Sequence, residues 1–310
     1  MQIIETSNIW QERAAAVTIG CFDGVHLGHR ALIAETCACA RAEGLLSVVL
    51  TFAPHPSAVF TGKPVPLLLT SAEKRDIIET LGADVYIDYP FTKSFAALPP
   101  ETFFRDVLVD ALQCKTLVVG ADFRFGQGGA GHIELAEQLG GELGIRIVTV
   151  PDREWNGAKI SSSRIRALVQ AQRFADAAQC LGAPYTVGGT VMEGKHLGRA
   201  IGYPTMNLHP PADRLLPPDG VYLTRTLRKG VLYDGLTNVG ISPTVGGHTQ
   251  LVETHLLDFA ADTYGERIHV QFIEYLRGET RFTSVGALKS QITADEAAAR
   301  RCFARAKAAD

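Results

Sequence analysis

The sequence predicts two domains of different fold class: an N-terminal α/β domain with a parallel sheet, and a small C-terminal antiparallel β-barrel followed by a helix. The chain has 310 residues, which is long for one domain and suits two. Over the first half, short apolar runs alternate with amphipathic segments, as in βαβ units. After Gly182-Ala-Pro184 the pattern changes to short alternating runs separated by Gly and Pro, which is typical of a barrel.

Five short apolar runs in the first half are predicted strands. They cover residues 17–19, 46–52, 85–89, 116–119 and 145–150. The amphipathic segments between them are predicted helices, at residues 29–44, 70–82, 100–112 and 133–139. The second of these begins with a capping box, Thr70-x-x-Glu73. Such alternation predicts a parallel sheet covered on both faces, whose ligands bind at the carboxyl ends of the strands.

The first candidate site follows the first predicted strand. Gly20-Cys-Phe-Asp-Gly-Val-His-Leu-Gly-His29 reads as a strand end, a glycine turn and the start of a helix. Such a turn lets phosphate oxygens reach backbone N–H groups at the positive end of a helix. His26 and His29 can face the same way, so we expect them to bind the phosphates of a nucleoside triphosphate and stabilise developing charge. A zinc half-site is the alternative, but no second cluster stands at ligand spacing nearby.

Two further motifs lie at predicted strand ends. In Phe52-Ala-Pro-His-Pro56, two prolines hold His55 near the end of its strand, and a rigid loop is the alternative reading. In Gly120-Ala-Asp-Phe-Arg-Phe-Gly126, aromatic residues alternate with charged ones. The rings of Phe123 and Phe125 suit a planar ligand and Arg124 suits phosphate, whereas the alternative places both rings in the core.

Residues 160–166, Ile-Ser-Ser-Ser-Arg-Ile-Arg, precede a helical pattern. Three hydroxyl groups at a helix N-terminus, with two arginines, form a predicted anion site. Simple N-capping by serine is the alternative, but capping needs one serine and neither Arg164 nor Arg166. A short helical segment at residues 174–181 then leads to the predicted domain boundary at Gly182-Ala-Pro184.

The second half is predicted to be mainly β. Its predicted strands cover residues 185–192, 221–227, 232–239, 251–259 and 268–276, and a final amphipathic helix covers about 285–306. The segment Gly194-Lys-His-Leu-Gly-Arg-Ala-Ile-Gly-Tyr-Pro-Thr-Met-Asn207 contains three glycines around Arg199, which suit phosphate binding. Thr205 and Asn207 face the same side of an extended segment, and their oxygens suit Mg²⁺ carried by ATP.

A second motif of this half is Val252-Glu-Thr-His-Leu-Leu-Asp-Phe259. With a period of two, Glu253 and His255 lie on one face of the strand, and Val252, Thr254 and Leu256 on the other. A carboxylate on a barrel strand is often only a solvated outer residue, and that reading stays open from the pattern alone.

Composition bounds the classes of function. Hydrophobic residues make up 46% and charged residues 20%, as in ordinary soluble globular proteins, and the net charge of −3 gives no basic field for nucleic acid. The six scattered cysteines indicate reduced thiols and a cytoplasmic protein, and no apolar run is long enough to span a membrane. The N-terminus has no basic region or long apolar segment, so no signal peptide is expected.

These motifs resemble known enzymes. His26-Leu-Gly-His29 is similar to the HxGH motif of adenylyl- and cytidylyltransferases, and residues 20–29 resemble the bacterial bifunctional riboflavin kinase/FMN adenylyltransferases, or FAD synthetases. Residues 160–166 resemble the second nucleotidyltransferase signature, with Ser163 in place of Thr. Residues 198–207 and 253–259 resemble the riboflavin kinase patterns Gly-Arg-x-x-Gly-x-Pro-Thr-x-Asn and Glu-x-His-Leu-Leu-Asp-Phe. The family usually has an acidic residue at position 53 and a small one at position 206, where this chain has Ala53 and Met206.

The resemblance implies a Rossmann-like nucleotidyltransferase domain and a riboflavin kinase-like barrel. It implies that ATP phosphorylates riboflavin to FMN and that a second ATP adenylylates FMN to FAD, with release of pyrophosphate. Glu253 would be the base of the first step, and His26 and His29 would stabilise the second. The residues expected to bind ATP or phosphate are Gly20, Phe22, Asp23, Gly24, Gly28, Ser161, Ser162, Ser163, Arg164, Arg166, Gly194, Gly198, Arg199 and Gly202. The residues expected to bind flavin are His55, Asp122, Phe123, Arg124 and Phe125, and Thr205 and Asn207 are expected to hold Mg²⁺.

We expect domains at residues 1–183 and 184–310, each with its own phosphate-handling motifs, in a monomer or weak homo-oligomer without nucleic-acid or membrane partners. Two alternatives remain from the sequence. One is a kinase whose adenylyltransferase half acts on another phosphate ester, and the other is a flavin-binding regulator without turnover. A regulator usually carries a DNA-reading module, and no basic recognition helix stands out in the sequence.

Overall fold

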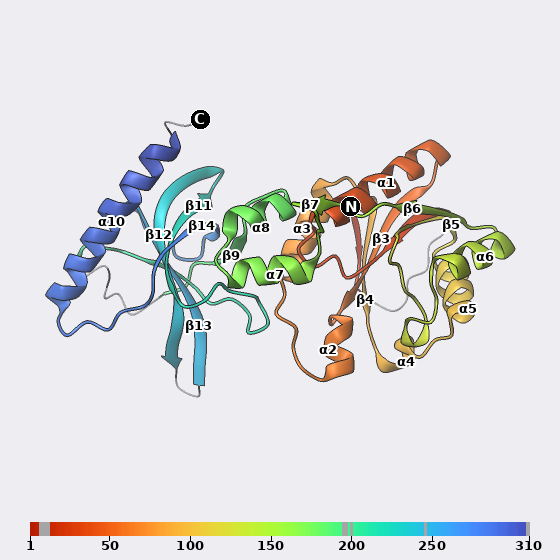
Figure 1. Ribbon diagram of the computed structural model, residues 1–310, viewed down its shortest axis with the longest axis horizontal. Coiled ribbons are helices and arrows are strands. Elements are labelled where there is room, and N and C mark those ends of the chain that lie inside the picture. The colour runs from red at the N-terminus through yellow and green to blue at the C-terminus, as the bar shows by residue number, and fades with distance from the viewer. Residues whose placement is uncertain (6–12, 194–197, 199–200, 245–246, 308–310) are drawn as a thin grey trace. The chain divides into compact units, whose positions relative to one another are not determined.

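The computed structural model describes the chain except at residues 6–12, 194–197, 199–200, 245–246 and 308–310 (Figure 1). The chain forms two compact units, Met1–Ser162 and Ser163–Asp310. The predicted fold class is confirmed for both: a parallel α/β sheet in the first and a nearly closed antiparallel barrel followed by a helix in the second. The predicted domain boundary between residues 183 and 184, with one enzyme activity on each side of it, stays a prediction.

The first unit is built on a six-stranded sheet in the order β1-β4-β3-β2-β5-β6, with every pairing parallel. Its strands are β1 (Gln2–Ile4), β2 (Ala15–Ile19), β3 (Leu46–Ala53), β4 (Val85–Pro90), β5 (Cys114–Gly120) and β6 (Arg146–Val150). From β2 the chain adds β3 and β4 on one side and then β5 and β6 on the other. The order therefore reverses between β2 and β5, where open α/β sheets form their ligand crevice.

Helices cover both faces of this sheet, as predicted. They are α1 (Leu27–Glu43), α2 (Pro56–Thr61), α3 (Ser71–Thr80), α4 (Lys93–Ala96), α5 (Pro100–Thr102), the π-helix η1 (Phe103–Ala111), the 3-10 turn η2 (Gln127–Gly129) and α6 (Ile133–Leu143). Successive residues of a strand point to opposite faces of the sheet. Val48 packs in one core cluster with Phe104 and Leu108 of η1. Val49 packs in another cluster with Ile33 of α1 and Ile78 of α3. The predicted capping box at Thr70 and Glu73 is confirmed at the start of α3.

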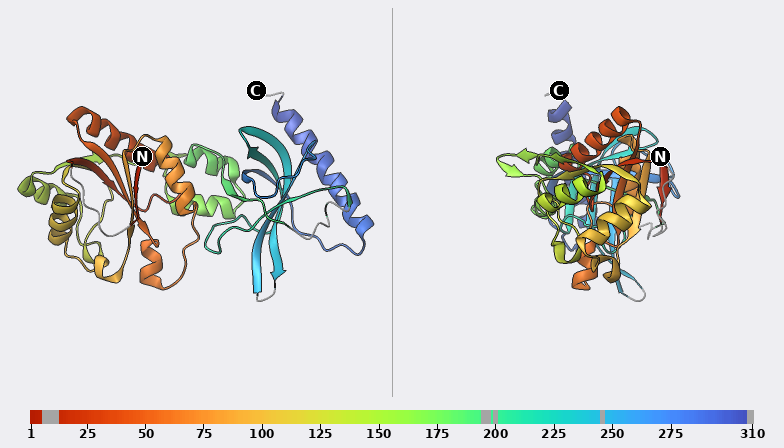
Figure 2. Two further views of the ribbon diagram at one scale, coloured as in Figure 1. Left: turned by 180° about the vertical axis from the view of Figure 1, so that it is seen from behind. Right: turned by 90° about the vertical axis from the view of Figure 1, so that its right-hand side faces the viewer.

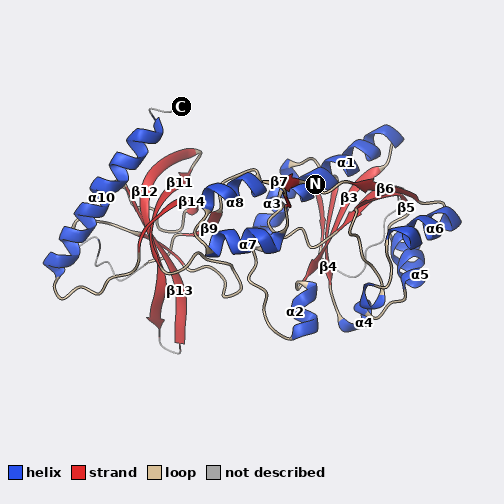
Figure 3. Ribbon diagram, in the orientation of Figure 1, coloured by secondary structure: helices blue, strands red, loops and turns tan. Residues whose placement is uncertain are grey.

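Some local elements differ from those expected. The helix predicted over residues 100–112 is α5 followed by a π-helix, and β1 and α2 were not predicted. A small hairpin, β7 (Glu154–Trp155) and β8 (Ala158–Lys159), precedes the serine-rich motif. Figure 3 distinguishes these helices and strands by colour. Elements of two or three residues are too short to give a hydrophobic period, so the sequence pattern alone does not reveal them.

The second unit begins with α7 (Ser162–Gln170) and α8 (Phe174–Leu181) and continues into six antiparallel strands in the order β10-β13-β12-β11-β14-β9. These are β9 (Thr186–Thr190), β10 (Met206–Leu208), β11 (Gly220–Arg228), β12 (Val231–Thr244), β13 (Gly247–Leu256) and β14 (Arg267–Arg277). Met192, just after β9, bridges Asn207 of β10, which brings the two ends of the sheet together. The sheet is therefore almost closed, which leaves little exposed edge.

The barrel wall has a buried inner side and an outer side that a helix covers. Inside, the hydroxyl groups of Thr224, Thr237 and Thr254 form a row with oxygen–oxygen distances of 2.8 and 2.9 Å. Outside, α10 (Val285–Lys307) packs Ala299 and Phe303 against Leu236 and its neighbours on β11 and β12. Figure 2 shows α10, in blue, beside these strands from two further directions. The outer side is thus an enclosed surface along part of its length.

Candidate active sites

The first candidate site is a cavity of about 630 Å³ at the carboxyl ends of β2, β3 and β5. It lies at the reversal of strand order, where the fold class predicts a ligand. Gly20 and Cys21 form part of its wall, and so does Arg124. Seven of the lining residues are phenylalanines: Phe52, Phe60, Phe91, Phe95, Phe103, Phe123 and Phe125. An apolar cavity with few polar groups suits a large planar ligand such as a flavin or an adenine ring.

The two predicted histidines lie together in the turn that follows Gly20 and Cys21, but neither is among the residues that line this cavity. His26 is the N-cap of α1, and its Nδ1 accepts a hydrogen bond from the His29 backbone N–H at 3.3 Å. The two rings stack with their centroids 3.6 Å apart. Gly28 permits this approach, because a Cβ atom there would lie 3.2 Å from the His26 ring. The expected pairing of the histidines in the first turn is therefore confirmed as geometry, while their role stays a prediction.

Both histidines are neutral at neutral pH. Burial, followed by the charge of Lys159, lowers the pKa of His26 to about 4. Burial also lowers the pKa of His29 well below its usual range, followed by the effects of His26 and Lys74. Since Nδ1 of His26 accepts a hydrogen bond, the proton of the neutral ring is on Nε2, which is left as a donor.

The structure joins the first motif to the serine motif. The Ser162 hydroxyl donates to the Asp23 carbonyl at 2.8 Å, although the two residues are 139 positions apart. The Asp23 carboxylate is occupied elsewhere, since it accepts the backbone N–H groups of Leu68 and Leu69 at 2.9 to 3.2 Å. Asp23 therefore orders the turn in this structure, and any contact with phosphate would come from the backbone.

The other residues predicted for this site have varied surroundings. Phe22 is fully buried with its ring against that of His29, and Gly24 has a φ of 86°, which glycine adopts readily. Ser161 lies just before α7, and Ser163, Arg164 and Arg166 lie in its first turns within the second compact unit. Ser163 is exposed, and the two arginines are half-buried.

The residues predicted to bind flavin separate into two groups. Phe123, Arg124 and Phe125 line the first cavity, where the two phenylalanine rings stack at 5.3 Å. Phe125 also belongs to the core cluster, as the alternative reading held, while its contact with a flavin stays a prediction. Asp122 instead accepts a hydrogen bond from Lys159 at 2.5 Å, and His55 caps α2 by accepting the Ser57 N–H at 3.2 Å. Asp122 and His55 are not among the residues that line the cavity.

The second candidate site is a cavity of about 510 Å³ between the outer side of the barrel and α10. Glu253 and Asn238 contribute from the strands, and Leu288 and Ile292 from the helix. The predicted alternation of β13 is confirmed, because Val252, Thr254 and Leu256 are buried whereas Glu253 and His255 are half-buried. Glu253 is therefore an outer residue, as the alternative reading held, but α10 encloses this part of the outer surface.

Three polar residues line up across the strands at this site. In register, Asn207 of β10 lies opposite Glu253 of β13, which lies opposite Asn238 of β12. Side chains paired in this way lie on the same side of the sheet. Asn238 donates to Glu279 at 3.3 Å, and Asn207 is only 5% exposed. The arrangement places a carboxylate between two amides at a cavity with both apolar and charged lining residues, which suits a reacting hydroxyl group.

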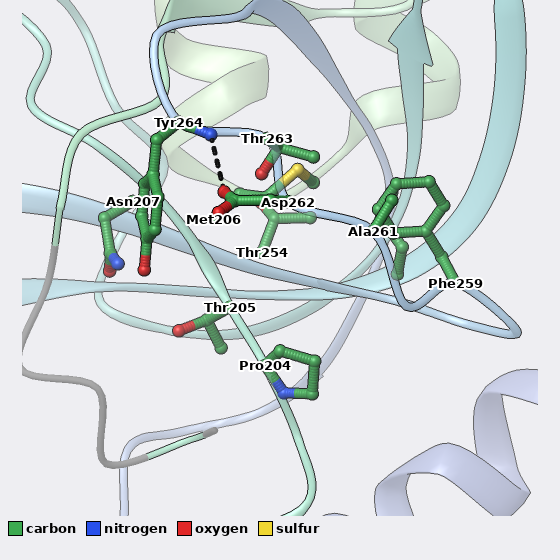
Figure 4. A pocket seen from close by; sticks show the side chains of 11 residues that line it. Pro204, Thr205, Met206, Asn207, Thr254, Phe259, Ala261, Asp262, Thr263 and Tyr264 are labelled. Atoms are coloured by element: carbon green, nitrogen blue, oxygen red, sulfur yellow. Dashed lines mark hydrogen bonds between the residues drawn. The ribbon is translucent and has the colours of Figure 1, made fainter. Parts of the chain in front are cut away.

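A small adjoining pocket contains the predicted metal ligands. Thr205 and Asn207 line it together with Asp262 and Tyr264 (Figure 4). Thr205 also lines the larger cavity, so the two pockets share this residue. A hydroxyl and an amide oxygen beside a carboxylate are hard donors that fit Mg²⁺. Of the phosphate-binding residues expected here, Gly198 lines the larger cavity and Gly202 lies in a turn, while Gly194 and Arg199 fall outside the described residues.

Several polar residues around the sites were not predicted. Lys74 is 6% exposed and donates to the Cys21 carbonyl of the first turn. Lys159 bridges Asp122 and Asp152. Arg277 binds Asp295 of α10 at 2.7 Å, and both line the second cavity. The density of phenylalanine between residues 91 and 104 was a signal for the first cavity, but nothing in the local sequence marks Lys74.

Two family models match the chain in order: FAD synthetase over residues 8–164 and riboflavin kinase over residues 181–303. The bifunctional riboflavin kinase/FMN adenylyltransferase of Escherichia coli strain K12 is 39% identical over 300 residues, which are 96% of each chain. The protein of the same name from Listeria monocytogenes is 35% identical over 305 residues, 97% of this chain and 96% of that one.

A crystal structure named as a macrolide-efflux protein from Streptococcus pneumoniae matches with a TM-score of 0.84 and 31% identity, over 97% of this chain and 99% of that one. In the part of our chain that the structure describes, no helix combines the length and apolar character needed to cross a membrane. The order of the two domain matches and the identity over almost the full length lead to one conclusion. The chain belongs to the family of bifunctional riboflavin kinase/FMN adenylyltransferases.

Proposed function

We propose that this chain phosphorylates riboflavin to FMN and adenylylates FMN to FAD, using ATP in both steps. The observation that carries the proposal is that each compact unit has a large cavity of its own, of about 630 and 510 Å³, with a family motif in or beside its wall. Membership of the family supports both activities.

In the second unit, Glu253 is proposed as the general base. Its carboxylate accepts the proton of the ribityl 5′-hydroxyl as that oxygen attacks the γ-phosphorus of ATP, and ADP leaves. Thr205 and Asn207, which line one pocket, would hold Mg²⁺. When bound, the ion neutralises charge on the phosphates of ATP. The apolar wall between barrel and helix would hold the flavin ring.

In the first unit, a phosphate oxygen of FMN attacks the α-phosphorus of ATP, and pyrophosphate leaves. A phosphate monoester is already anionic at neutral pH, so this step needs no general base. His26 and His29 are proposed to donate hydrogen bonds to the phosphates as neutral rings, which their lowered pKa values support. Ser162, Arg164 and Arg166 are proposed to hold the departing pyrophosphate, and Phe123 and Phe125 to contact the flavin.

We also propose a localisation, a class of partner and an oligomeric state. All six cysteines are free, which supports a reducing compartment such as the cytoplasm. The net charge of −3 supports small-molecule partners rather than nucleic acid. We propose a monomer or weak homo-oligomer, because each unit has a cavity that its own residues line.

A product assay tests the proposal. Purified protein is incubated with riboflavin, ATP and Mg²⁺, and the flavins are separated over time. We expect FMN to appear first and FAD to follow. FMN that accumulates without FAD would favour an adenylyltransferase half for another phosphate ester, and unchanged riboflavin would overturn the kinase assignment and leave a flavin-binding regulator.

A further inference from the structure

The turn that carries the two histidines holds an unfavourable backbone conformation. Phe22 and Val25 have positive φ values of 48° and 37°, a region that bulky side chains rarely adopt. Both residues are fully buried. A residue in this conformation persists only where its surroundings enforce it. Something outside the turn must therefore hold this conformation.

Side chains from other elements bind the turn through its carbonyl groups. The Cys21 carbonyl accepts hydrogen bonds from the Thr51 hydroxyl at 3.0 Å and the Lys74 ammonium at 3.3 Å. Lys74 also donates to the Thr51 hydroxyl at 2.9 Å, so the three groups form a closed triangle. The Asp23 carbonyl is bound by Ser162, as described above, and the Val25 carbonyl by Arg30 at 3.0 Å.

The direction of the Cys21 carbonyl fixes the direction of the next N–H group. In a planar trans peptide, the carbonyl oxygen and the following N–H point in opposite directions. A Cys21 carbonyl held toward Lys74 therefore turns the Phe22 N–H away from it. The neighbouring residues Gly20 and Cys21 line the cavity, so this peptide lies at the edge of the site. Backbone N–H groups held in this way are suited to bind phosphate.

A lysine at this position is unusual enough to need a reason. Burial lowers the pKa of Lys74, while Asp88 and Asp23 act in the opposite direction. Thr51 is fully buried and Lys74 is 6% exposed, so the ammonium group has little contact with water. A neutral donor would satisfy the Cys21 carbonyl at a lower cost of burial. The positive charge also helps to keep His29 neutral, because Lys74 contributes to its lowered pKa.

We propose that Lys74 is a positioning residue for adenylyl transfer, whose ammonium group, with Thr51, holds the Cys21 carbonyl and thereby directs the turn toward the phosphates of ATP. The inference rests on the proposed function of the first cavity. Lys74 touches no reacting atom in this scheme and acts through the peptide that follows Cys21.

The test compares Lys74→Met with Lys115→Met, since Lys115 is an exposed lysine on β5 of the same unit. FAD formation from FMN and FMN formation from riboflavin are measured on each preparation at saturating substrates. Misplacement of groups by about 1 Å can cost about 10²-fold in rate. We expect Lys74→Met to lower kcat for FAD formation by about that factor, with FMN formation unchanged, and Lys115→Met to leave both unchanged.

Thr51→Val and the double variant separate positioning from general stability. Because both side chains act on one carbonyl, we expect the double variant to be no slower than Lys74→Met alone. If Lys74→Met does not fold, as judged by tryptophan fluorescence, a loss of FAD formation by folded Thr51→Val decides in favour of the proposal, and its absence decides against it.

Wild-type kcat for FAD formation in Lys74→Met would overturn the proposal, and so would losses that multiply in the double variant. A wild-type protein that makes FMN but no FAD would instead refute the proposed function of the first cavity, so the two failures are distinguishable.

Discussion

His26 caps helix α1 only while its ring is neutral, because Nδ1 accepts the His29 N–H. Burial lowers the folded-state pKa of His26 to about 4, below the usual 6.5 that applies to the unfolded chain. Between these values the unfolded state binds more protons, so the free energy of unfolding falls as pH falls from 6.5 toward 4. The difference corresponds to about 3 kcal/mol from this residue.

We predict that His26→Asn, which keeps a capping side chain and removes the titration, shows a smaller loss of stability over this pH range than the wild type. Urea unfolding at several pH values, followed by tryptophan fluorescence, checks this, because Trp155 lies in the first unit. His132 caps α6 in the same way but its side chain is 49% exposed, so His132→Asn is the matched control. Equal pH dependence in all three proteins would contradict the account.

Glu253 carries the kinase assignment at the residue scale. Glu253→Gln keeps the shape of the side chain and removes its ability to accept a proton. We predict that FMN formation falls by about 10² to 10⁴, the usual contribution of a general base, while FAD formation from supplied FMN persists. Both rates are measured on one preparation. An unchanged kinase rate would make Glu253 an ordinary residue of the outer barrel wall.

At this scale, the sequence predicts contacts between residues a few positions apart and misses contacts between residues far apart in the chain. The pairing of His26 with His29 follows from a spacing of three residues, and the structure confirms it as geometry. The hydrogen bonds of Asp23 to Leu68 and Leu69 join residues 45 and 46 positions apart, and the sequence gives no sign of them. Lys74 was missed for the same reason. Its contact with Cys21 spans 53 positions and appears only once α3 packs beside the turn.

At the scale of elements, helix α8 determines where a stable fragment of the second domain begins. Phe174 is 2% exposed, and its ring lies 5.6 Å from that of Phe272 and 5.7 Å from that of Tyr222. A fragment that begins at residue 184 lacks this helix and exposes apolar surface on the barrel. Burial of one such aromatic side chain contributes about 1.5–3 kcal/mol.

We predict that fragments 163–310 and 184–310 both phosphorylate riboflavin and make no FAD, and that the longer fragment unfolds at the higher temperature. Circular dichroism and a flavin product assay on each fragment check this. Equal unfolding temperatures would show that α8 contributes nothing to the barrel. A folded fragment that makes no FMN would show that the kinase site needs the first unit.

The long elements were the most predictable. Apolar runs predicted five strands of the first sheet, and the capping box predicted the start of α3, because these signals are local and repeated. The strand β12 extends to Thr244, beyond the expected end at residue 239, because its partner β13 continues the ladder. The short strands β1 and β10 depend on pairing with β4 and β13, which no local pattern encodes.

At the scale of the whole molecule, we propose that each unit holds its own site and that FMN is released from one site before it binds to the other. Each cavity is lined by residues of a single compact unit. Under the proposed function, FMN made in the second unit is the substrate of the first. Damage to one site should therefore spare the other, and two differently damaged proteins should complete the pathway together.

The most direct test mixes His29→Ala with Glu253→Gln and supplies riboflavin, ATP and Mg²⁺. His29→Ala alone should stop at FMN, with FAD formation reduced by about 10² to 10³, and Glu253→Gln alone should leave riboflavin unchanged but convert supplied FMN to FAD. We predict that the mixture makes FAD from riboflavin. Loss of both activities in either single variant, or wild-type FAD formation by His29→Ala, would contradict it.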